Sequence, residues 1–135
     1  MAHAEFEHMK KIDKTNLSDE ERKILEIDAD TRAIELILST YRSKEMSELA
    51  IIIGLASILF FNNNLDGGNK HPNIDTRLTN AINKLKLSDD SPIWPFLVLV
   101  FKDWDKQFIL SLTHQSVYDK YKDFFDDLLS AAQSA

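Results

Sequence analysis

The chain has 135 residues, a formal net charge of −6 and no cysteine. Acidic charge without a stripe of lysines and arginines argues against binding to nucleic acid phosphates, so we expect no nucleic acid partner. The lack of cysteine excludes disulfides and thiolate metal sites and favours a cytoplasmic location, and the length suits one domain, 1–135, with one core.

The first helix signal follows a polar, charged opening that does not read as a secretory signal. Ser18 and Glu21 have the spacing of a capping box, in which Ser18 is the N-cap and Glu21 reaches back to it. The helix that they begin is expected to run to about Arg42. Its core-facing stripe is predicted to contain Leu25, Ala29, Leu36 and Thr40, broadened by Ile27, Ile34, Ile37 and Tyr41.

The next segment, 46–61, is the most apolar of the chain. Its uncharged stretch from Leu49 to Phe61 has 13 residues, fewer than the roughly 18 to 20 that a bilayer span requires. We therefore expect a buried core helix, with membrane association as the alternative. The turn-forming residues of 62–69 end this helix and predict a mobile loop.

Three further helices are expected in the second half of the chain. One begins near Pro72, one runs from Trp94 to Leu112, and one covers 115–131. In the last, Tyr118, Tyr121 and Phe125 belong to an aromatic stripe that serves either the core or a protein partner. Strand signals are weak everywhere, so the predicted fold class is all-α, a single bundle of five or six helices.

Histidines and acidic residues gather in the opening stretch, Met1 to His8. Zinc peptidases with an H-E-x-x-H motif use two histidines, four apart on a helix, as ligands and the glutamate to activate water. The motif can be aligned with the opening residues in two registers, and each alignment matches only part of it. In one, His3 is the second histidine and the missing His-Glu pair would lie just upstream of Met1; in the other, Glu5 and His8 match and Ala4 replaces the first histidine.

Two later motifs carry the remaining candidate residues. Glu26 begins a Glu-x-x-Ala-Asp sequence, and Asp30, four residues on, lies on the same helix face. His71 and Arg77 belong to a His-Pro-x-x-x-x-Arg segment. Taken singly, each has a plainer interpretation: an exposed N-terminal histidine, acids that complement a helix dipole, and the first turn of a helix with a solvated arginine.

In this order, the three motifs resemble the HtpX-like zinc metallopeptidases and the phage-exclusion peptidases of the Lit type, over about positions 1 to 82. The resemblance implies zinc as the cofactor. It implies His3 and Glu26 as metal ligands and Asp30 as the residue that orients a ligand. The candidate cleft residues that it implies are Glu5, His8, His71 and Arg77.

The resulting interpretation is the C-terminal part of a metallopeptidase-like domain that starts inside its own H-E-x-x-H motif. Without one ligand and the catalytic base, the chain is expected to lack peptidase activity, whereas a full-length form would hydrolyse peptide bonds with zinc. The alternatives are a small acidic helical module that binds a protein partner, such as an antitoxin, immunity or phage-defence accessory protein, and a membrane-associated fragment organised by 49–61.

Overall fold

The computed structural model describes residues 17–40 and 43–135. Within these ranges the chain forms five α-helices and one 3₁₀ helix and no strand, which confirms the all-α prediction. The elements are α2 (Asp19–Thr40), α3 (Lys44–Ala56), η1 (Ser57–Phe61), α4 (Ile74–Leu85), α5 (Ile93–Phe108) and α6 (Tyr121–Ser134).

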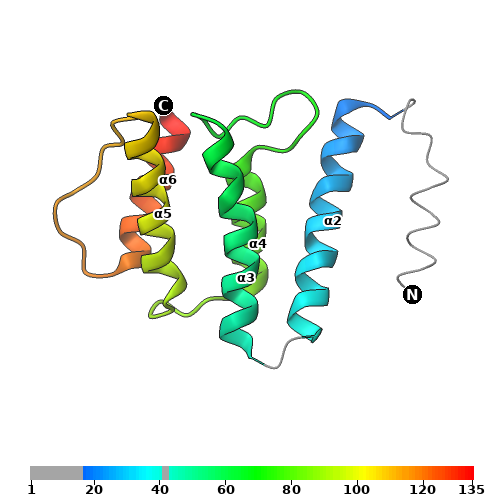
Figure 1. The fold of residues 1–135 in the computed structure, drawn as a ribbon, viewed down its shortest axis with the longest axis horizontal. Helices are drawn as coiled ribbons and strands as arrows, with labels where there is room; N and C mark the ends of the chain where they lie inside the picture. The colour runs from blue at the N-terminus through cyan, green and yellow to red at the C-terminus, as the bar shows by residue number, and fades with distance from the viewer. Residues whose placement is uncertain (1–16, 41–42) are drawn as a thin grey trace.

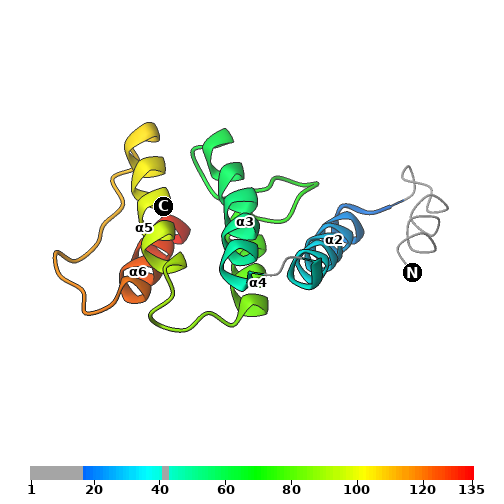
Figure 2. The same cartoon turned by 60° about the horizontal axis from the view of Figure 1, so that its bottom comes forward.

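The helices stand side by side in a row of three groups (Figure 1). The paired helices α3 and α4 form the middle group, α2 lies on one side of it, and α5 and α6 lie on the other; the rotated view shows the same order (Figure 2). Contacts between elements agree, because α2 packs on α3 and α4, whereas α5 packs on α3 and α6. The helix α2 is therefore an outer helix of the part that the structure describes.

The core is continuous from α2 to α6 and is richest in aromatic rings where α5 meets α6. Phe101 and Phe125 meet edge to face with ring centroids 5.3 Å apart, and Trp94 lies 5.8 Å from Phe125. The indole N–H groups are also satisfied: Trp104 donates to the carbonyl of Asn62 at 2.8 Å. Edge-to-face pairs of this kind add to the stabilisation from burial alone.

The capping box at the start of α2 is confirmed. The Glu21 amide donates to Ser18 Oγ at 3.1 Å, and the Ser18 amide donates to Glu21 Oε2 at 3.3 Å. The predicted core stripe of this helix is confirmed only in part. Leu36, one of its central residues, is 65% exposed, whereas Ile34, which was predicted to broaden the stripe, is the buried residue of α2. Both sets of residues are apolar at helical spacing, so the sequence pattern could not show which one is buried.

The last two helices differ from their predicted bounds. Helix α5 ends at Phe108, where Ile109 takes a left-handed backbone conformation, φ 54°, and Leu112 is buried from the following segment. Helix α6 begins at Tyr121, six residues later than predicted. Of the predicted aromatic stripe, Phe125 is 1% exposed and belongs to the core, whereas Tyr121 is 58% exposed.

The segment 46–61 forms α3 and η1, and its buried face contributes Ile51, Ile52 and Leu59 to the core. None of the helices within 17–40 and 43–135 combines the length and the apolar character needed to cross a membrane.

Candidate functional site

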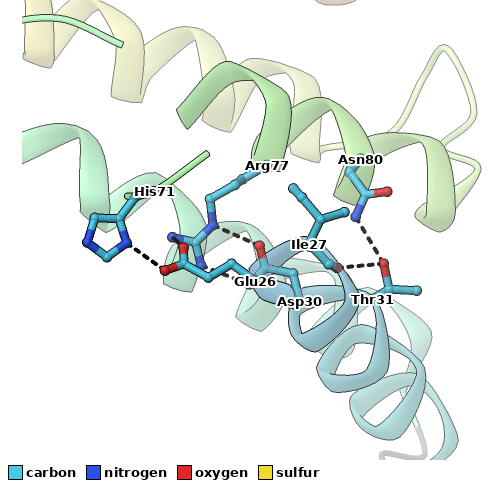
Figure 3. Close-up of polar contacts among 7 residues, drawn as sticks. All are labelled: Glu26, Ile27, Asp30, Thr31, His71, Arg77 and Asn80. Carbon is cyan, nitrogen blue, oxygen red and sulfur yellow. Dashed lines mark hydrogen bonds and ion pairs between the residues drawn. The ribbon is translucent and has the colours of Figure 1, made fainter. Parts of the chain in front are cut away.

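Polar side chains from α2 and from the start of α4 meet at the junction of these two helices (Figure 3). Glu26 and Asp30 project from α2, one turn apart, as their spacing predicts. Arg77 lies in the first turns of α4, and His71 lies in the segment that leads into α4. The structure thus brings Glu26 to His71 and Asp30 to Arg77, two pairs whose members lie more than 40 positions apart in the sequence.

Arg77 and Asp30 form a two-point ion pair. The guanidinium donates from Nε to Asp30 Oδ2 at 2.7 Å and from Nη2 to Oδ1 at 2.8 Å. Both side chains are largely buried, with 21% and 15% of their surface exposed. The hydrogen bond with Asp30 is the main reason that the pKa of Arg77 is raised, and burial acts in the opposite direction. Asp30 therefore has both oxygens occupied by Arg77.

Glu26 and His71 form the more open half of the cluster. His71 Nδ1 and Glu26 Oε1 lie 2.5 Å apart, and the two side chains are 64% and 32% exposed. The other oxygen of Glu26 lies 3.8 Å from Nη1 of Arg77, which links this pair to the first one. Nδ1 of His71 is the ring nitrogen engaged with Glu26, so Nε2 is the nitrogen left for a further partner.

A second polar tie joins the same helices one turn further along. Asn80 Nδ2 of α4 donates to Thr31 Oγ1 of α2 at 3.2 Å, and the Thr31 hydroxyl donates to the carbonyl of Ile27 at 2.9 Å. The sequence analysis did not single out Thr31 or Asn80. Asn80, three residues after Arg77, lies on the same face of α4, and this spacing was the signal that could have identified it. Thr31 directly follows Asp30 and carries no comparable spacing signal.

The loop before α4 sets the position of His71. The Gly67 amide donates to Asn73 Oδ1 at 3.0 Å, and the Ile74 amide donates to the carbonyl of Leu65 at 2.9 Å, so the loop is tied to the start of α4. A Cβ atom on Gly67 would collide with the carbonyl oxygens of His71 and Pro72. Glycine is therefore required at this position, because any side chain would push the backbone that carries His71.

The proposed zinc shell can be examined only in part. Glu26 and Asp30 lie in the cluster, whereas His3, Glu5 and His8 lie outside the described residues. Among 17–40 and 43–135, no group of three or more His, Cys, Asp or Glu side chains is arranged to hold a metal ion. The assignments of Glu26 as a ligand and of His71 and Arg77 as cleft residues stay predictions.

A comparison with known families gives a match over most of the chain. The model of the family Peptidase U49 matches residues 1–97. No curated protein and no solved structure matches the chain. The matched range includes the opening stretch and the whole cluster at the α2–α4 junction, and it ends within α5, so α6 lies beyond it. Because the match covers more than half of the sequence, the chain belongs to the Peptidase U49 family of Lit-type metallopeptidases.

Proposed function

We propose that the cluster at the α2–α4 junction is the carboxylate side of a zinc peptidase site, with Glu26 as a metal ligand. One observation carries this proposal: Glu26 and His71 meet at 2.5 Å on a partly exposed surface, inside the range that matches a peptidase family. A carboxylate and an imidazole are both ligand types that zinc accepts.

The chemistry of the described side chains fits zinc, but their number does not complete a site. We assign Asp30 a positioning role and not that of a direct ligand, because it forms a two-point ion pair with Arg77. Catalytic zinc ordinarily has three ligands from the protein, so donors must come from outside the described residues, and His3 is our candidate. When bound, zinc would polarise the peptide carbonyl and make a water molecule nucleophilic.

The other residues of the cluster have separate tasks in this proposal. The Arg77–Asp30 pair holds the start of α4 against α2 and so fixes the distance between Glu26 and His71. His71 faces solvent with Nε2 free of the Glu26 contact. When protonated, His71 can donate from Nε2 to a substrate oxygen on which negative charge develops.

A shallow groove of about 340 Å³ lies beside the cluster, between α2 and the start of α4. Its lining includes Ile27 and Pro72, the direct sequence neighbours of Glu26 and His71. Apolar surface next to the reacting groups is what a peptide side chain requires for binding. We propose this groove as a subsite for the substrate.

The 135 residues contain no complete H-E-x-x-H motif. In the register of His3 the first histidine and the base that activates water are both missing, and in the register of Glu5 and His8 the first histidine is missing. We therefore propose that the 135 residues do not hydrolyse peptides on their own and that a complete motif gives zinc-assisted hydrolysis of peptide bonds.

The test is to complete the motif in each of the two registers. One protein has a His-Glu dipeptide added before Met1, and the other has the substitution Ala4→His. We measure zinc affinity by competition with a chromogenic chelator, together with zinc-dependent cleavage of an unstructured protein substrate. In the correct register, zinc affinity should rise by about tenfold or more and cleavage should appear.

The decisive control is made in the more active of these two backgrounds. Glu26→Gln should abolish the gain in zinc affinity, whereas Glu20→Gln, on an exposed side chain of the same helix, should preserve it. If neither completed motif binds zinc more tightly, or if Glu26→Gln leaves the affinity unchanged, Glu26 is not a metal ligand and the proposal is wrong.

A further inference from the structure

Glu48 is a buried acidic residue that has no part in the proposed peptidase site. It lies in the second turn of α3, and only 7% of its surface is exposed. Among residues 17–40 and 43–135, none donates a hydrogen bond to its carboxylate or forms an ion pair with it. A carboxylate that leaves water is ordinarily paired, because burial without a partner is costly. Within the described part of the chain, Glu48 therefore lacks the partner that its burial requires.

Glu48 lines a pocket of about 470 Å³. The pocket lies where α3 begins, α4 ends and α5 begins, and these three helix ends lie together on one side of the molecule (Figure 1). Within the described residues, the unpaired side-chain oxygen that is sealed from solvent is Asp75 Oδ1, so the oxygens of Glu48 stay accessible through the pocket. A volume of this size suits a small molecule.

The pocket carries charges of both signs around Glu48. Lys44 and Lys86, from the start of α3 and the end of α4, line it together with Glu45 and Asp90. These four residues are exposed, whereas Glu48 is buried. A positive group on a ligand is therefore attracted to the buried carboxylate, and a negative group on the same ligand is attracted to the two lysines. The same lysines repel a metal cation, so the charges favour a zwitterion.

The pocket also has an apolar wall, formed by Leu87, Pro92 and Ile93. The turn that carries this wall is held in place by the carbonyl of Ser88, which accepts from the Ser91 amide at 3.0 Å and from the indole N–H of Trp94 at 2.9 Å. A wall that is already ordered costs little to organise when a ligand binds. It offers a surface on which an apolar side chain of the ligand can pack.

We propose that this pocket binds a free amino acid or a dipeptide with an apolar side chain, since such a molecule combines an ammonium group, a carboxylate and an apolar group. The ammonium group pairs with Glu48, and the carboxylate faces Lys44 and Lys86. Arg77 and the rest of the α2–α4 cluster lie at the opposite end of α4, so the two sites are separate. This proposal is independent of the proposed zinc site, and either one can fail without the other.

The experiment is a titration of the whole chain with the dipeptide leucyl-leucine, followed by the NMR signals of the two indole N–H groups. Trp94 donates to the carbonyl of Ser88, which lines the pocket, so its signal should shift as the dipeptide binds. Trp104 donates to the carbonyl of Asn62, outside the pocket, and its signal should not shift. Glu48→Gln should raise the dissociation constant by about tenfold or more, because the ammonium group loses its counter-charge. Circular dichroism checks that the variant is folded.

N-acetyl-leucyl-leucine tests the same contact from the side of the ligand, because it lacks the ammonium group. The wild type should bind it about tenfold or more weakly than leucyl-leucine, and Glu48→Gln should not weaken its binding further. Leucyl-leucine amide, which lacks the carboxylate, should also bind more weakly than leucyl-leucine.

Glu35→Gln is the matched control, because it changes an exposed carboxylate of α2 outside the pocket, and it should leave the dissociation constant of leucyl-leucine unchanged. The proposal is overturned if leucyl-leucine does not shift the Trp94 signal, or if the wild type binds either modified dipeptide as tightly as leucyl-leucine. It is also overturned if Glu48→Gln weakens the binding of the acetylated dipeptide as much as that of leucyl-leucine, since Glu48 would then only shape the pocket.

Discussion

Replacement of Arg77 by methionine tests whether the polar cluster holds α2 in place. The substitution keeps most of the aliphatic stem and removes two charge-assisted hydrogen bonds to Asp30. Exposed ion pairs contribute about 0 to 1 kcal/mol, whereas removal of one partner from a fully buried pair costs about 3 to 5 kcal/mol. With Arg77 and Asp30 at 21% and 15% exposed, we expect a loss of about 2 kcal/mol in the free energy of unfolding.

A double-mutant cycle separates the pair from its surroundings. Asp30→Asn alone should also destabilise the protein, and the double variant should be more stable than the sum of the two single effects predicts, with a coupling energy of about 1 kcal/mol or more. The assay is urea unfolding at neutral pH, followed by the fluorescence of Trp94 and Trp104, both of which are buried.

The control for this cycle is Glu20→Gln, which removes a 3.8 Å contact with Lys23 on the exposed side of the same helix. This change should cost no more than about 0.5 kcal/mol. If Arg77→Met shifts the unfolding curve no further than Glu20→Gln does, the ion pair does not secure α2, and our explanation of how Glu26 is positioned fails.

Three further substitutions test separate parts of the structure. Gly67→Ala should lower the free energy of unfolding by about 2 kcal/mol, because the new Cβ atom would collide with backbone carbonyls. Gly54→Ala, which adds a Cβ atom in open space within a helix, should raise it by up to about 1 kcal/mol. Equal thermal midpoints for the two variants would show that no such collision occurs at Gly67. The pKa of Asp89 is lowered, mainly by the hydrogen bond from Lys120 at 3.0 Å, so its stabilising effect is complete above its ordinary value of 3.8 and is lost as the pH falls through the lower folded value. The stability difference between wild type and Asp89→Asn should therefore shrink on acidification, and a difference that stays constant would exclude this pair as its source. Ser18→Ala should lower the free energy of unfolding by about 1 kcal/mol through the loss of the N-cap, and an unchanged urea midpoint would show that the first turn of α2 contributes nothing.

Features of this fold that depend on residues close together in the sequence could be predicted. Ser18 and Glu21 mark the start of α2 because a capping box satisfies two backbone amides within one turn. Likewise, the i, i+4 spacing of Glu26 and Asp30 placed both carboxylates on one face before any tertiary contact was known. The close approach of this face to His71 and Arg77 followed from no local rule, and it was expected only because the ordered motifs resemble a peptidase family.

Other features depended on neighbours that a sequence pattern does not specify. Helix α2 has two apolar stripes, and the one with Ile34 is buried only because α3 and α4 lie on that side. The start of α6 was placed too early because Val117 and Tyr118 continue its apolar spacing. In the structure, the hydroxyl of Tyr118 instead accepts from the Gln115 amide and donates to Asp127, and these bonds hold a non-helical segment against α6.

The position of Glu26 depends on polar contacts more than on apolar packing. From Asp19 to Ala33, no residue of α2 is buried, and the buried Ile34 comes only in the second half of the helix. The stretch from Asp19 to Ala33 is therefore held to α4 by the contacts of Glu26, Asp30 and Thr31. If Glu26 is a zinc ligand, metal binding and the docking of α2 are thermodynamically linked. In a protein with a completed motif, zinc should then raise the unfolding midpoint, and Arg77→Met should weaken zinc binding even though Arg77 never contacts the metal. Unchanged zinc affinity in that variant would mean that Glu26 is positioned without the help of the ion pair.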